Sequence, residues 1–139
     1  MRKVVVDTSV YVDFFRRGGE NPLKRILSDF SYAIYLSSVV AQELFAGAQD
    51  EKDVGEIERF FGSFERSGRV LTPSKSDWLE CGRVLSQIGR KHGFESVKKG
   101  RLVNDILIAL SCHDVEAAIL TLNLKDFQMI GEFIEIEIL

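Results

Sequence analysis

Short apolar strands alternate with helical segments along this chain of 139 residues, and no other feature limits its possible folds so strongly. Residues 3–6 are a β-branched run, typical of a strand buried on both faces. Further strands are predicted at residues 33–36, 69–71, 117–121 and 133–138. Helices are predicted at residues 10–15, 22–30, 39–48, 51–64, 75–93 and 101–113. This alternation indicates an α/β fold whose central, mostly parallel sheet is flanked by helices.

Local signals mark where several helices begin or end. Asn21 followed by Pro22 is typical of an N-cap with proline in the first helical turn. The serines at 37–38 and Ser74 are further cap residues, and the aspartate three residues after Ser74 resembles the partner in a capping box. The glycine pair at 18–19 is expected to end the first helix.

Length and composition favour one ordinary globular domain spanning residues 1–139. The net charge of −3 gives no overall basic field for nucleic acid, although a local basic patch can still bind phosphate. Cys81 and Cys112 are far apart and have no metal-ligand spacing, so we expect buried thiols. The chain shows no signal peptide and no membrane-spanning stretch, so we expect a soluble, reduced, cytoplasmic protein.

Asp7 directly follows the strand at residues 3–6, so it lies at the carboxyl edge of the predicted sheet. Parallel sheets place their ligand sites at this edge. An aspartate in this position can instead cap the next helix, with Thr8 or Ser9 as rival caps. Asp7 alone therefore leaves both interpretations open.

Glu43 and Asp105 are carboxylates on helix faces that otherwise carry apolar or small residues. A buried, ionised carboxylate needs a cation, a metal ion or strong hydrogen bonds. A buried salt bridge or an exposed helix face would also explain Glu43. Arg101, four residues before Asp105, would explain that side chain as an ordinary helical ion pair.

Thr121, Asn123 and Asp126 follow the predicted strand at 117–121, at the same carboxyl edge. A polar loop with Asp126 capping a short helix is the structural alternative. Taken together, these sites could converge on one pocket of hard oxygen ligands, which suits Mg²⁺ or Mn²⁺. His92 and His113 are the only histidines, which argues against a zinc site or a histidine base.

Four segments resemble the signature segments of the PIN-domain family, in the same order: VVVDTSVYVDFF, SSVVAQELFAG, GRLVNDILIALSCH and ILTLNLKDF. The length and the segment PSKSDWLECGRVLSQIGRKHG are similar to VapC toxins of toxin–antitoxin pairs. The resemblance implies a PIN-like, Rossmann-like three-layer fold and a metal-dependent endoribonuclease. It also implies a cognate VapB-like antitoxin whose tail covers the acidic pocket, and a homodimer.

The resemblance assigns metal coordination to Asp7, Glu43 and Asp105, with Thr8, Ser9 and Thr121 as supporting residues. Many family members carry a fourth acid where this chain has Asn123, so Asn123 is a candidate catalytic residue and Asp126 an additional candidate ligand. Within the implied mechanism, a metal-activated water attacks the phosphorus and leaves 5′-phosphate and 3′-hydroxyl ends.

A basic stretch precedes Asp105 and is a candidate RNA-binding segment: Arg90, Lys91, His92, Lys98, Lys99 and Arg101. A solvated helix end with its loop is the alternative. The phenylalanines and Trp78 are expected in the core or at a partner interface. Two other functions stay open: an aspartate-based phosphatase with Asp7 as nucleophile, and a PIN-like binding module with little or no activity.

Overall fold

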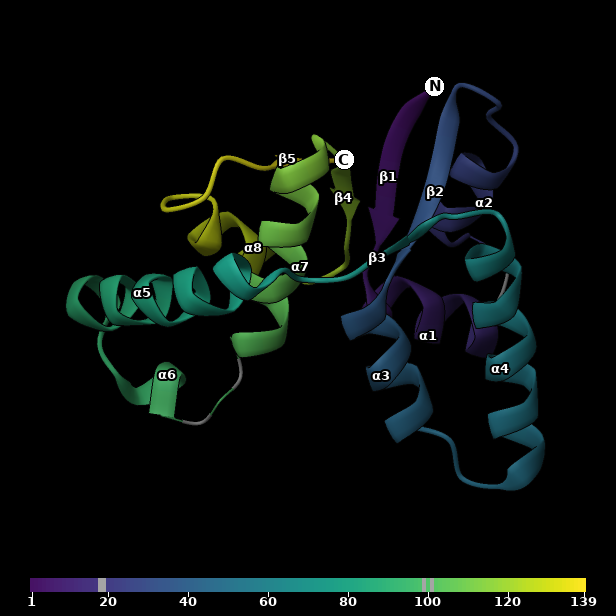
Figure 1. Ribbon diagram of the computed structural model, residues 1–139, viewed down its shortest axis with the longest axis horizontal. Helices are drawn as coiled ribbons and strands as arrows, with labels where there is room; N and C mark the ends of the chain where they lie inside the picture. Colours follow the sequence, from purple (N-terminus) through teal and green to yellow (C-terminus); the bar gives the residue numbers. More distant parts are fainter. Residues whose placement is uncertain (18–19, 99, 101) are drawn as a thin grey trace.

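A five-stranded parallel sheet forms the centre of the computed structural model, which describes residues 1–17, 20–98, 100 and 102–139 (Figure 1). The strand order is β3-β2-β1-β4-β5, and every neighbouring pair is parallel. The strands are β1 (Arg2–Val6), β2 (Tyr32–Ser37), β3 (Val70–Leu71), β4 (Ala118–Leu120) and β5 (Glu137–Ile138). The predicted α/β class and parallel sheet are confirmed.

Helices connect successive strands: α1 (Thr8–Arg17), α2 (Pro22–Leu27), α3 (Ser38–Ala46), α4 (Glu51–Arg66), α5 (Lys75–His92), α6 (Glu95–Lys98), α7 (Val103–Val115) and α8 (Leu124–Ile130). The predicted caps are confirmed: the Asn21 side chain accepts from Leu23 N–H, and Ser37 caps α3. Ser74 and Asp77 form the expected capping box at the start of α5. The predicted break at 18–19 lies outside the described residues. No described helix has the length and apolar character needed to cross a membrane.

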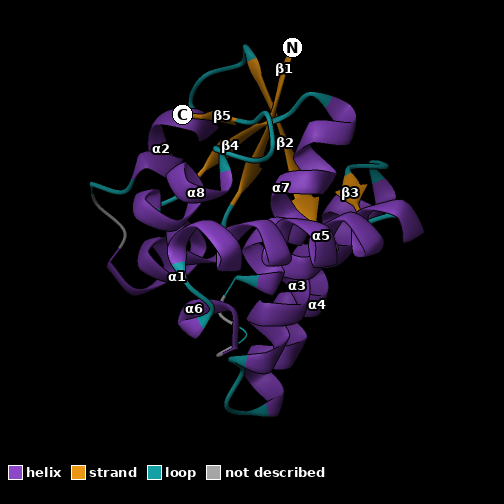
Figure 2. Ribbon diagram, turned by 90° about the vertical axis from the view of Figure 1, so that its left-hand side faces the viewer, coloured by secondary structure: helices purple, strands orange, loops and turns teal. Residues whose placement is uncertain are grey.

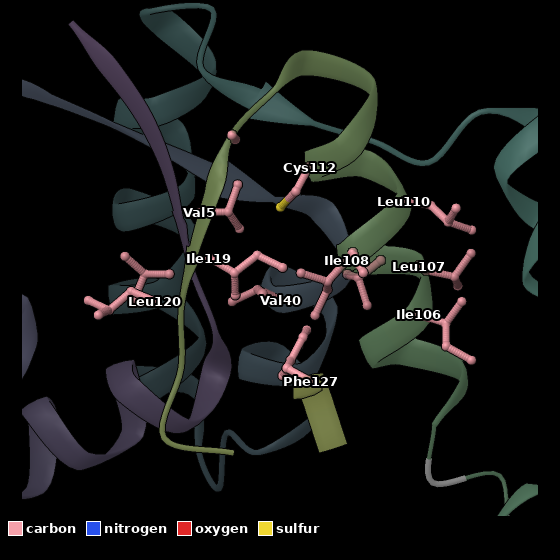
Figure 3. Packing of buried hydrophobic residues seen from close by; sticks show 14 of the residues in the cluster. Val5, Val40, Ile106, Leu107, Ile108, Leu110, Cys112, Ile119, Leu120 and Phe127 are labelled. Carbon is pink, nitrogen blue, oxygen red and sulfur yellow. The ribbon is translucent and has the colours of Figure 1, made fainter. Parts of the chain in front are cut away.

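The helix α7 lies against β4 and is covered on its other side by α5, as Figures 1 and 2 show. Cys112 and Ile108 of α7 point toward Ile119 and Val5 of the sheet, whereas Leu107 points away from it (Figure 3). These side chains are almost fully buried. Burial on two sides explains why the sequence of α7 is apolar nearly all round. The elements α1, α2 and α4 lie on the other side of β1 and β2 (Figure 1).

Two predicted boundaries were wrong. The helix predicted at 22–30 ends at Leu27, because the chain turns at Ser28 and the Asp29 carboxylate accepts from Ser31 N–H. The strand predicted at 133–138 is shortened to β5, at residues 137–138. Residues 131–134 instead continue the turn after α8, and Ile134 N–H donates to the Ile130 carbonyl. The short helix α6 had no predicted counterpart.

The strand order places a change of winding direction between β1 and β4. Chain connections run from β1 outward to β2 and β3, and then return to β4 and β5 on the other side. In parallel sheets, ligands bind beyond the carboxyl ends of the strands at such a point. The fold therefore predicts a ligand site at the residues that follow Val6 and Leu120.

Candidate functional site

Asp7 lies where the carboxyl ends of β1 and β4 diverge. Its backbone N–H donates to the Leu120 carbonyl (2.8 Å), which holds it beside β4. Its side chain is buried, and Oδ2 accepts from the hydroxyls of Ser9 (2.8 Å) and Thr121 (2.9 Å). Among the described residues, no α1 backbone N–H donates to this carboxylate. The Asp7 side chain is thus held in the pocket rather than used as a helix cap.

Glu43 reaches the same region from α3. The Thr8 hydroxyl donates to Glu43 Oε1 (2.8 Å) and so connects the first turn of α1 to α3. The Glu43 side chain is half-buried. Its negative charge is one of those that raise the pKa of Asp105, so the two carboxylates lie near each other.

Asp105, in the first turn of α7, is joined to the loop after β4 by Asn123. Asn123 Nδ2 donates to Asp105 Oδ2 and to Asp126 Oδ2, at 3.1 Å in each case. The Asn123 backbone N–H donates to Thr121 Oγ1 (2.9 Å). One chain of hydrogen bonds therefore runs from Ser9 through Asp7, Thr121 and Asn123 to the other two aspartates. Asn123 is the N-cap residue of α8 and Asp126 lies in its first turn, so the structural alternative in which Asp126 is the cap was wrong.

The carboxylates of this pocket act on one another electrostatically. Burial, together with the negative charges of Asp7, Glu43 and Asp126, raises the pKa of Asp105 to about 7, and the hydrogen bond from Asn123 opposes this rise. The ion pairs between described residues involve none of Asp7, Glu43 and Asp105. The alternative partner of Asp105, Arg101, lies outside the described residues. Repulsion in the pocket thus favours a cation.

The donor set fits a hard divalent cation, since every candidate ligand is a carboxylate or amide oxygen. Within the described part of the chain, however, no three His, Cys, Asp or Glu side chains are grouped closely enough to form a ready-made metal site. The hydroxyls of Thr8, Ser9 and Thr121 hold the carboxylates instead. Metal binding would require these side chains to move together.

A groove of about 510 Å³ adjoins the pocket and shares Glu43 with it. Phe15 of α1 and Phe60 of α4 line it, and Phe15 is largely exposed. The Tyr11 ring packs against both phenylalanines, and its buried hydroxyl has no hydrogen-bond partner among the described residues. This groove was not predicted from the sequence, although the aromatic residues of α1 indicated it.

The candidate RNA-binding residues fall into two groups. Arg90 and Lys91 are exposed at the end of α5, and Lys91 Nζ lies 3.3 Å from a Glu132 carboxylate oxygen. Lys98 ends α6, while the predictions for Lys99 and Arg101 lie outside the described residues.

A larger cavity of about 770 Å³, lined by Lys3, His113 and Glu135 among others, contains none of the predicted site residues.

The fold and the pocket together define a class: α/β proteins with a carboxylate site at the point where the winding of a parallel sheet reverses. The family model described as "PIN domain" matches residues 4–132, so the chain belongs to the PIN domain family. A comparison with curated proteins found no match.

Solved structures confirm the fold. A DNA-bound VapBC structure from Salmonella typhimurium has a chain that is 22% identical, with a TM-score of 0.73 and coverage of 100% of this chain and 98% of that one. VapBC-1 from nontypeable Haemophilus influenzae gives 21% identity and a TM-score of 0.68, covering 99% and 96%. FitAcB from Neisseria gonorrhoeae gives 19% identity and a TM-score of 0.66, covering 97% and 95%.

Proposed function

We propose that this protein is a metal-dependent endoribonuclease of the VapC toxin type. The observation that supports it best is the electrostatic repulsion that Asp7, Glu43 and Asp126 exert on Asp105, with no ion-pair partner for Asp7, Glu43 or Asp105 among the described residues. Membership of the PIN domain family and the similarity to VapBC structures agree with this function.

Asp7, Glu43 and Asp105 would hold Mg²⁺ or Mn²⁺, with Asp126 as an additional ligand. When bound, the metal supplies an activated water and stabilises the charge that develops on the phosphate. Thr8 would orient Glu43 through the hydrogen bond they share. Carboxylate oxygens of these residues would accept hydrogen bonds from the water and so orient it toward the phosphorus.

Ser9 and Thr121 would fix one oxygen of Asp7 and leave the other free for coordination, because both hydroxyls bind the same atom, Oδ2. Asn123 would bridge Asp105 and Asp126 and offset their repulsion, since its amide donates to both carboxylates. An acid at position 123 would add repulsion where the amide now supplies two hydrogen bonds. The candidate catalytic residue Asn123 would therefore act as a positioning residue, through its hydrogen bond to Asp105.

RNA would approach along the basic segment before α7, where Arg90, Lys91, Lys98, Lys99 and Arg101 would bind phosphates and position the strand. Lys91 is held by Glu132, so its contribution would be smaller than that of Arg90.

A VapB-like antitoxin would be the protein partner, because the similar structures include VapBC complexes. The groove beside Glu43 suits a segment that combines apolar side chains with a cation, since it is lined by phenylalanines and by Glu43 and Glu56. Phe15→Ser is expected to release such a partner, measured by co-purification. We also propose a homodimer, which light scattering of the purified protein would test.

RNA cleavage by the purified protein tests the function. We expect cleavage of single-stranded RNA in Mn²⁺ or Mg²⁺, and its loss in Asp7→Asn and Asp105→Asn. Asp114→Asn is the matched control, because Asp114 lies on the same helix as Asp105 but is exposed and outside the pocket. Activity that persists in both pocket variants, or in excess EDTA, would overturn the proposal.

The two alternative functions predict different results when the same purified protein is assayed. An aspartate-based phosphatase would hydrolyse a phosphomonoester and become phosphorylated on Asp7. In this chain Ser9, two residues later, donates to the same carboxylate and leaves no second acid there. An inactive PIN-like module would bind RNA or its partner but cleave nothing in either metal.

A further inference from the structure

The turn from α5 to α6 brings one aromatic ring, that of Phe94, against Gly89 of α5. Gly93 ends α5 with φ +97°, a left-handed conformation that favours glycine, and its N–H donates to the Gly89 carbonyl (2.9 Å). The reversed chain folds Phe94 back onto the helix. A Cβ added to Gly89 would lie 2.1 Å from Phe94 Cε1, so only glycine at position 89 admits the ring as it stands.

Phe94 is nevertheless far from buried, with 46% of its surface exposed. One part of the ring is therefore seated in the notch at Gly89, while the rest faces solvent. An apolar ring that contributed only to the core would be covered more fully. A ring that is packed on one side and open on the other is suited to stack on a flat ligand.

The surrounding sequence is strongly basic, although the whole chain is acidic. Residues 90–101 contain five lysines and arginines and one acid, Glu95, against a net charge of −3 for the protein. The same segment leads into α7, whose first turn carries Asp105. Among the described residues, Arg90 and Lys91 are exposed at the end of α5, close in sequence to Phe94. Cations in the same segment as an exposed aromatic ring are the combination that binds single-stranded nucleic acid, because phosphates pair with the cations and bases stack on the ring.

We propose that Phe94 stacks on an unpaired base of the RNA strand that the carboxylate pocket cleaves, at a nucleotide away from the scissile bond. This inference rests on the proposed ribonuclease function. It assigns the substrate as single-stranded RNA and makes Phe94 a binding residue, with Gly89 as the residue that positions its ring. Stacking tolerates any base, so Phe94 contributes affinity and little sequence preference.

Binding of a short single-stranded RNA carrying 2-aminopurine, measured in EDTA by fluorescence, tests this without cleavage. We expect quenching at one position in the wild type, and in Phe94→Leu a loss of that quenching with affinity weakened about fivefold or more. Phe94→Tyr should keep both, because it retains the ring. Phe30→Leu is the matched control, since Phe30 is 90% exposed but precedes β2, outside this segment.

Steady-state cleavage in Mn²⁺ provides the second arm. Phe94→Leu and Gly89→Ala should raise KM and leave kcat nearly unchanged, because the pocket is intact. Unchanged affinity in Phe94→Leu, or a wild type that quenches 2-aminopurine at no position, would overturn the inference. A protein that binds and quenches in EDTA but never cleaves would refute the ribonuclease function and leave the stacking site standing.

Discussion

Replacing Asp105 with asparagine should stabilise the metal-free protein at alkaline pH. The variant keeps the shape of the side chain and an oxygen that can accept from Asn123, but it removes the charge. The folded-state pKa of Asp105 is about 7, against an ordinary value of 3.8. Because the folded pKa is the higher one, ionisation opposes folding: the stability is fully present below pH 4 and is lost as pH rises through 7.

The difference between 3.8 and about 7 corresponds to about 4 kcal/mol at pH 8. Urea unfolding of the metal-free wild type and Asp105→Asn at pH 4 and pH 8 measures this. We expect similar stabilities at pH 4 and a more stable variant at pH 8, a gain of up to about 4 kcal/mol. Added Mg²⁺ should stabilise only the wild type at pH 8. A variant that is equally destabilised at both pH values would refute the reasoning.

Three further outcomes follow from single contacts. Thr8→Val removes the hydrogen bond to Glu43 and should weaken Mn²⁺ binding about tenfold or more by calorimetry; unchanged affinity would contradict the orienting role. Burial and the neighbouring Asp77 raise the pKa of Asp114 to about 6, so Asp114→Asn should raise the free energy of unfolding in urea at pH 8 but not at pH 4, by less than about 2 kcal/mol because the side chain is exposed. Phe127→Ala should cost about 3–5 kcal/mol in urea unfolding, since this ring is fully buried; a loss under about 1 kcal/mol would show that the core can close around the cavity.

The sequence predicted the order of the elements well because the signals were local. The β-branched run ending at Val6, the cap at Asn21 and the capping box at Ser74 each depend on residues within four positions of one another. The end of α2 and the shortness of β5 were missed because each predicted element was extended through a turn, although the hydrogen bonds that form these turns span only two to four residues.

The pocket was predictable in part for a different reason. Asp7 and Thr121 follow two strands that the topology makes neighbours, so a parallel sheet alone brings them to the same edge. The partners of Thr8 and Asn123 were not predictable, because rotamers in the folded protein decide them. Phe94 was assigned to the core or an interface by its residue type; the glycines at 89 and 93 were the only signal for its seat on α5.

Anomalous diffraction from crystals of the wild-type protein grown with Mn²⁺ tests the central claim most directly. A shared divalent ion predicts a strong peak bounded by the carboxylates of Asp7, Glu43 and Asp105, lost in crystals of Asp105→Asn. A crystal that shows no peak in this pocket, under conditions where the same protein cleaves RNA in Mn²⁺, would contradict the account.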